Sequence, residues 1–148
     1  MSPQLKLLAL VVLVGSGVAC TTGRYSSAAF HLPVDGNAEK GKMVFVSLGC
    51  HSCHAVTGAD LERPTVQPPV PVVLGGEVDH RLSDAYLVTS MIDPSYALAP
   101  HVKEQITRDG KSRMPNYADQ LTARQMTDLV AFLQSHYTVR IMRPEYPR

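Results

Sequence analysis

Two cysteines and a histidine that could form covalent and metal bonds lie within five consecutive residues. Cys50 and Cys53 are separated by two residues, and His54 follows directly. Two thiols at this spacing can bond to the two vinyl groups of one porphyrin, and the adjacent imidazole then lies under the iron as its proximal ligand. The pattern therefore predicts one covalently bound haem c, held by Cys50 and Cys53 and ligated by His54.

Other chemistry for the same residues has less support. A structural zinc site needs four ligands, and no second cluster of suitable spacing exists in the chain. A thioredoxin-like redox pair is expected in a βαβ setting, which is not visible here. A disulfide between Cys50 and Cys53 would close a very small loop and would leave His54 unexplained.

The N-terminal segment predicts export. Residues 1–19 combine Lys6, an apolar run from Leu7 to Val14 and small residues that end at Cys20, which is the organisation of a secretory signal peptide. The apolar run is shorter than the roughly 20 residues that span a bilayer, so a permanent membrane helix is the weaker alternative. Haem c attachment needs an exported chain, so the two features agree.

The small residues before Cys20 resemble the lipobox of bacterial lipoproteins, in which the cysteine is acylated and becomes the mature N-terminus. Gly17 departs from this pattern, because lipoboxes favour leucine there. The resemblance implies a protein anchored by lipid at Cys20 on the periplasmic side of a bacterial membrane. Residues 20–36 lack helical or strand periodicity and are expected to form a flexible tether. The alternative is an incidental cysteine in a signal peptide cut elsewhere.

Composition sets limits on the remaining chain. Its 148 residues are 45% hydrophobic and 18% charged, which is typical of one globular domain. Removal of residues 1–19 leaves thirteen basic and thirteen acidic residues, so the basic excess of a nucleic-acid-binding protein is absent. Eleven prolines, four of them between residues 64 and 71, predict long loops and not helix in residues 62–76.

Three amphipathic helices are predicted by their capping residues. Asn37 or Asp35 can cap a helix that begins near residue 38 and runs into Cys50. Ser83 can cap a middle helix that reaches residue 91 or 92 before Pro94. A T-x-x-Q capping box, residues 122–125, begins a helix over residues 123–135.

At this point the chain resembles the class I c-type cytochromes, which are small all-α electron carriers. The resemblance covers residues 37–136 and includes the C-x-x-C-H pattern, the Met-Pro pair at residues 114 and 115, and an aromatic stretch around Phe132. In that family a glycine of the N-terminal helix meets an aromatic residue of the C-terminal helix, which implies contact between Gly41 and Phe132. The resemblance implies an all-α, cytochrome c-like fold of three to four helices around one haem. Residues 137–148 are a C-terminal extension that either packs back on the domain or docks a partner.

Met114 is the expected distal iron ligand. It lies in a polar loop that no hydrophobic face explains, sixty residues after His54, and it matches the family's Met-Pro motif. Met43, Met91 and Met126 follow helical patterns and are expected in the core. The other donors by type are Met142, His31, His51, His80, His101 and His136, of which His101 is the leading alternative.

Some supporting roles stay open at this stage. In the resembled family a proline carbonyl accepts the Nδ1 proton of the haem histidine, and Pro69 or Pro71 could do so here. Tyr86, Tyr96 and Tyr117 either donate to haem propionates or only pack. The lysines at 42, 103 and 111 either surround a docking face or are simply solvated.

These features predict outer-sphere electron transfer and no enzymatic role. An iron ligated by both His54 and Met114 has no free position for a small-molecule substrate, so the expected partners are redox proteins and the membrane that holds the lipid anchor. One alternative is a fixed haem subunit of a larger respiratory oxidoreductase. The other is a haem peroxidase or gas sensor, for which His101 and Arg113 would be the distal residues.

Overall fold

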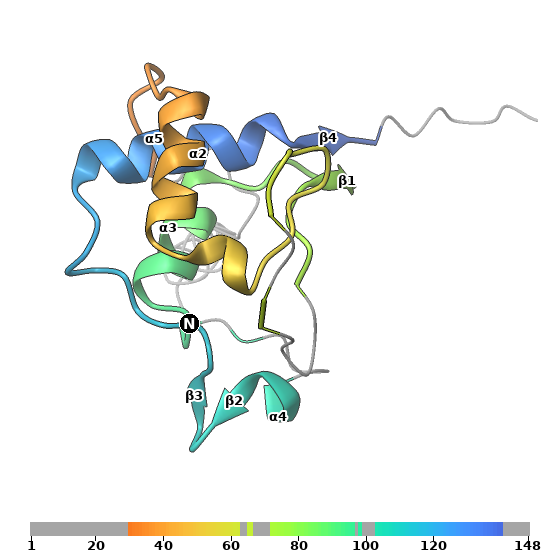
Figure 1. Cartoon of the computed structure of the whole chain (residues 1–148), viewed down its shortest axis with the longest axis vertical. Helices are drawn as coiled ribbons and strands as arrows, with labels where there is room; N and C mark the ends of the chain where they lie inside the picture. The colour runs from red at the N-terminus through yellow and green to blue at the C-terminus, as the bar shows by residue number, and fades with distance from the viewer. Residues whose placement is uncertain (1–29, 63–64, 67–71, 97, 99–102, 141–148) are drawn as a thin grey trace, which may run out of the picture.

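The computed structural model describes residues 30–62, 65–66, 72–96, 98 and 103–140. Three helices form the body of the domain: α2 (Ala38–Ser47), α3 (Asp84–Ile92) and α5 (Ala123–Ser135). Helix α5 lies across α2 near one end of the molecule, and a small hairpin projects from the other end (Figure 1). Cys20 and the rest of residues 1–29 lie outside the described residues.

The capping side chains begin each helix where the sequence predicts. The Asn37 side chain accepts a hydrogen bond from the backbone N–H of Lys40, and Ser83 does the same for Tyr86. Thr122 and Gln125 form both halves of the predicted capping box. These side chains satisfy N–H groups that a helix cannot pair internally, which explains why the starts are well defined.

The first helix ends earlier than predicted. Helix α2 stops at Ser47, and Gly49 adopts a left-handed conformation with φ of 72°. A 3-10 turn, η1 (Cys50–Ser52), then begins the C-x-x-C-H segment. Glycine tolerates the left-handed conformation without steric cost, so it separates the helix from the cysteine turn.

The contact between α2 and α5 is the centre of the fold. A Cβ atom added at Gly41 would overlap the Asp128 carbonyl and lie 2.7 Å from the Phe132 Cβ, so only glycine permits this approach. The rings of Phe45 and Phe132 pack with centroids 5.5 Å apart. The predicted contact between Gly41 and Phe132 is therefore confirmed. The buried core consists of Val44, Phe45, Val56, Leu87, Val88, Met91, Leu129, Val130, Phe132 and Leu133.

The placement of the helical methionines is partly different from the prediction. Met91 is buried and Met126 packs partly buried against the core, as predicted. The prediction is wrong for Met43, which is 63% exposed. The inward side of α2 is formed by Gly41, Val44 and Phe45, and position 43 falls outside it.

The helices fit the predicted cytochrome c-like fold, and short strands of two or three residues accompany them. Strand β1 (Gly76–Val78) pairs in parallel with β4 (Tyr137–Val139), and β2 (Thr107–Arg108) pairs antiparallel with β3 (Lys111–Ser112). A one-turn helix, α4 (Lys103–Ile106), precedes β2. Strands of two or three residues are too short to show an alternating pattern, which is why the sequence did not indicate them. Among the described helices, none has the length and apolar character needed to cross a bilayer.

Candidate cofactor site

The C-x-x-C-H segment is folded into a tight turn. The backbone N–H groups of Cys53 and His54 both donate to the Cys50 carbonyl, at 3.2 and 3.0 Å. The Ser52 hydroxyl donates to the Gly49 carbonyl at 2.6 Å and closes the same turn. Both cysteines are half-buried and unpaired, so the structure offers two free thiols and does not form the alternative disulfide.

His54 is held by a backbone carbonyl from a distant loop. Its Nδ1 lies 3.0 Å from the Val72 carbonyl oxygen, and because a carbonyl only accepts, Nδ1 carries the proton. That tautomer leaves the lone pair on Nε2, the atom that binds iron when the other ring nitrogen is fixed in this way. Pro69 and Pro71, the predicted acceptors, lie outside the described residues, and the observed acceptor is the residue after Pro71.

The loop that carries Val72 is attached to the cysteine segment by backbone hydrogen bonds. Thr57 N–H donates to the Leu74 carbonyl at 2.8 Å, and Leu74 N–H donates to the Ala55 carbonyl at 2.9 Å. Gly76 N–H donates to the His136 carbonyl at 2.8 Å, which connects this loop to the end of α5. The Val72 carbonyl is therefore positioned by the fold and not by the local turn alone.

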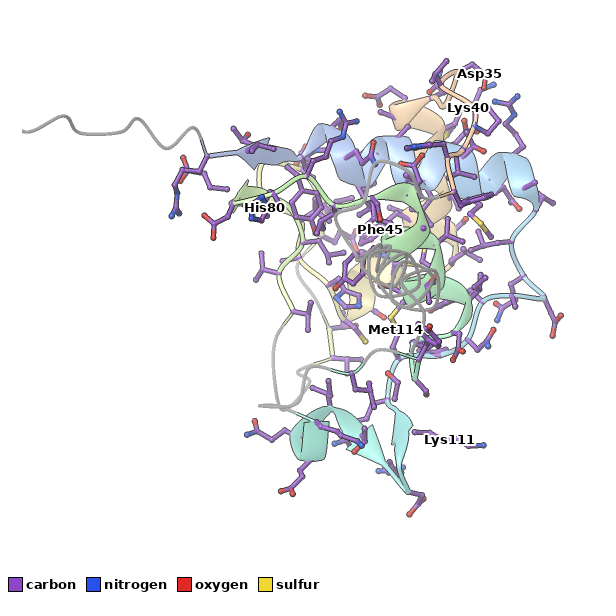
Figure 2. All side chains as sticks on the ribbon, turned by 180° about the vertical axis from the view of Figure 1, so that it is seen from behind. Asp35, Lys40, Phe45, His80, Lys111 and Met114 are labelled. Atoms are coloured by element: carbon purple, nitrogen blue, oxygen red, sulfur yellow. The ribbon has the colours of Figure 1, made fainter. Side chains whose placement is uncertain are left out.

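Met114 lies where the β2–β3 hairpin joins the helical body. Its side chain is half-buried and packs against the core, and Figure 2 shows it between Phe45 and the projecting hairpin. The Met114 N–H donates to the Ser112 hydroxyl at 3.1 Å. Three residues later, Tyr117 N–H donates to the Met91 carbonyl at the end of α3, at 3.0 Å. The loop that presents the thioether is thus fixed on both sides.

The electrostatics connect this loop to the cysteine segment. Burial raises the pKa of the Cys50 thiol to about 11. The pKa of Tyr117 is also raised, first by burial and then by negative charge on Cys50 and Cys53. Cys50 and Met114 also pack against the same core cluster, so the Met114 loop and the cysteine segment share one side of the core.

The side chains present fit haem c. The site combines two free thiols, an imidazole with Nε2 as its remaining donor, and a thioether on a fixed loop. His51 Nδ1 is buried without a hydrogen-bond partner beside these groups. In contrast, the described residues contain no group of three or more His, Cys, Asp or Glu side chains that could hold a metal ion directly.

The alternative donors are placed elsewhere or have other partners. His136 Nδ1 lies 2.8 Å from the Phe132 carbonyl, and its ring packs edge-on against Phe132. His31 lies 3.7 Å from the Asp84 carboxylate. His80 lies beside β1, away from Met114 (Figure 2). His101 and Met142 are outside the described residues.

Comparison with known proteins assigns the family. The model of the family described as "Cytochrome C oxidase, cbb3-type, subunit III" matches residues 36–133, which is most of the domain. The chain belongs to this family of c-type cytochromes. It binds haem c covalently, and its activity is electron transfer through that haem. No curated protein and no solved structure matches the chain.

Three supporting groups in this cytochrome were not found from the sequence. They are the Val72 carbonyl, the Ser112 hydroxyl and the Tyr117 backbone N–H. Backbone groups have no residue signature, so only the proline-rich loop pointed to the region of Val72. A serine two residues before a candidate ligand was a visible signal for Ser112, because serine commonly bonds a nearby backbone N–H.

Proposed function

We propose that this cytochrome carries one haem, joined to Cys50 and Cys53 and ligated by His54 and Met114, and that it transfers single electrons between redox proteins. The observation that supports this most directly is the anchoring on both sides of the site. His54 is oriented by the Val72 carbonyl, and the Met114 loop is fixed by Ser112 and Met91. Ligands fixed in this way suit a site that must not rearrange when its charge changes.

Each side chain has a distinct part in the proposed site. When bound, haem c supplies an iron that gains or loses one electron. The Val72 carbonyl holds the His54 ring and increases its basicity. The Met114 thioether is a soft ligand that favours the reduced ion, so it raises the reduction potential relative to two histidines. With both residues as ligands, no group in the site is needed as an acid, base or nucleophile.

The proposed setting follows from the N-terminal sequence. Lipid at Cys20 anchors the domain on the periplasmic side of the membrane, and residues 20–29 tether it, since residues 30–36 contact the domain itself. Two or more acyl chains give stable attachment, whereas one chain gives only marginal binding. A second candidate function is a fixed haem subunit of a membrane oxidase, and it is favoured by the family description, which names an oxidase subunit.

The distal ligand is tested by Met114→Ala in the holoprotein, with Met43→Ala as the matched control because Met43 is exposed. We expect low-spin ferric haem with a far-red methionine charge-transfer band in the wild type and in Met43→Ala. The band should be lost in Met114→Ala. A high-spin wild type that binds carbon monoxide readily would contradict the electron-transfer assignment and favour the peroxidase or sensor.

A further inference from the structure

The segment that contains α4 and the β2–β3 hairpin concentrates positive charge in an otherwise balanced chain. Residues 103–113 contain four basic and two acidic residues, whereas the remaining residues after Cys20 contain nine bases and eleven acids, counting residues 21–148. The bases are Lys103, Arg108, Lys111 and Arg113, and all four are exposed. The net charge of the whole chain therefore creates little electrostatic attraction toward a partner. An electric field that steers a partner must come from a local group of charges such as this one.

The register places three of these bases on one face. Arg108 pairs directly with Lys111, and the Arg113 N–H continues the ladder by donating to the Ile106 carbonyl at 2.9 Å. Because side chains alternate along a strand, positions 108, 111 and 113 share a face, and Thr107 and Ser112 lie on the other. A hollow of about 520 Å³ on the hairpin is lined by Arg108, Asp109, Lys111, Ser112 and Arg113.

Among the described residues, the bases of this face form no ion pair. Arg124 pairs with Asp35, Arg140 approaches Glu77 and Asp79, and Arg81 donates to Gln134. Arg108 and Arg113 have no such side-chain partner among the described residues. Like charges directly opposite one another in an antiparallel pair are destabilising, so Arg108 and Lys111 weaken the hairpin that carries them. A local loss of stability that no contact within the protein offsets is expected at functional surfaces.

The hairpin nevertheless has a defined conformation and a short connection to the site. Its turn residues Asp109 and Gly110 both have positive φ, 52° and 76°, as in the two-residue turns that match the twist of a hairpin. Ser112 N–H donates to the Ser95 hydroxyl at 3.0 Å, and Ser112 Oγ accepts from Met114 N–H. A partner that binds the basic face is therefore held beside the proposed distal ligand.

We infer that the face formed by Arg108, Lys111 and Arg113 is the docking surface for a carboxylate-rich redox partner, which exchanges electrons on the Met114 side of the haem. This inference rests on the proposed electron-transfer function and names the chemistry of its partner. A lipid surface fits less well, because binding to anionic membranes typically uses roughly four to eight clustered bases.

The test uses the holoprotein with fluorescein-labelled poly-L-glutamate as the acidic probe, followed by fluorescence anisotropy. Lys111→Glu is compared with Lys40→Glu, since both lysines are exposed and the charge change is the same. Figure 2 shows Lys111 at the outer end of the hairpin and Lys40 at the opposite end of the molecule. We expect Lys111→Glu to weaken probe binding about tenfold at low salt and Lys40→Glu to have little effect.

Further variants and probes distinguish a charged docking surface from damage to the hairpin and from membrane binding. Lys111→Arg keeps the charge and should keep the affinity, which distinguishes loss of charge from damage to the hairpin. Equal weakening by Lys111→Glu and Lys40→Glu would overturn the inference, as would hairpin-dependent binding to phosphatidylglycerol vesicles that exceeds binding to the probe. The methionine charge-transfer band is recorded for every sample. Its absence in the wild type would contradict the proposed function itself, whereas a normal band without probe binding would contradict only the docking surface.

Discussion

At the scale of single residues, hydrogen bonds between distant segments position the side chains of the proposed site and the helices around it. The Val72 carbonyl orients His54, and the Asp128 carboxylate likewise holds the start of α2. Asp128 is only 4% exposed and accepts a hydrogen bond at 2.8 Å from the Asn37 backbone N–H, at the start of α2. This contact attaches the beginning of the first helix to the middle of the last.

Asp128→Ala should therefore lower the free energy of unfolding by more than its small change in side-chain volume indicates. The substitution removes the part-buried hydrogen bond of the Asn37 N–H, and hydrogen bonds to charged groups contribute about 1.5–3 kcal/mol. Asp128→Asn keeps an oxygen acceptor and should retain more of the stability. Urea unfolding of the holoprotein measures both changes, and equal losses in the two variants would show that the hydrogen bond is not what matters at this position.

At the scale of elements, the crossing of α2 and α5 decides the geometry of the domain. It depends on the absence of a side chain at Gly41, which faces the Asp128 carbonyl and Phe132. Helix α2 leads into the cysteine turn. At the end of α5, the His136 carbonyl accepts the hydrogen bond that anchors the Val72 loop. A change in the distance between these helices would therefore displace the proposed haem ligands.

Gly41→Ala should destabilise the protein although alanine is the better helix former. The gain in helix propensity is at most about 1 kcal/mol, whereas overpacking a close contact costs about 1–3 kcal/mol and here involves rigid backbone. We expect a net loss of about 1–2 kcal/mol in the free energy of unfolding, measured with urea. Lys40→Ala in the exposed part of the same helix is the control. If Gly41→Ala had the same free energy of unfolding as the wild type, α2 and α5 would be able to move apart without loss of stability.

The burial of Tyr137, the first residue of β4, predicts that the stability of the protein falls at alkaline pH. Burial raises the pKa of Tyr137 above its ordinary value of 10.0, with a smaller opposing effect from the Gly75 backbone. A phenol whose folded pKa is raised contributes stability below pH 10 that is lost as the pH rises further. The urea midpoint of the wild type should thus fall between pH 9 and 11 by more than that of Tyr137→Phe. Tyr96→Phe, at a residue 77% exposed, should behave like the wild type.

Elements with strong local signals were predictable from the sequence, and those formed by long-range pairing were not. The three helices begin at Asn37, Ser83 and Thr122 because each side chain caps its own helix, so the information is local. The same holds for the cysteine motif, in which the spacing itself determines the chemistry. Strand β1 exists only because β4 returns to pair with it, and Val72 contributes a backbone atom that any residue could supply.

At the scale of the whole molecule, the remaining question is whether the domain moves between partners or stays in one complex. The lipid anchor proposed at Cys20 restricts the domain to the membrane surface in either case. Residues 30–36 are attached to the domain, because the Leu32 N–H donates to Asp84 and Asp35 pairs with Arg124. The tether expected over residues 20–36 is therefore limited to residues 20–29, which would have a mean span of about 16–19 Å if they are flexible. That distance allows a free domain to reorient toward one partner and then another without leaving the membrane.

Cys20→Ser separates these possibilities because it removes the acylated side chain and leaves residues 30–140 unchanged. For a lipid-anchored shuttle, the variant should move from the membrane fraction to the periplasmic extract with its haem spectrum intact. A fixed oxidase subunit should instead remain with the membranes and copurify with the complex in mild detergent, because its protein contacts persist without lipid. A wash of the membranes with high salt then distinguishes the type of contact. If the salt releases the retained variant, the interface is charged, as proposed for the hairpin, because salt screens exposed ion pairs. Retention with no copurifying protein would show that residues 1–19 remain attached as a membrane anchor.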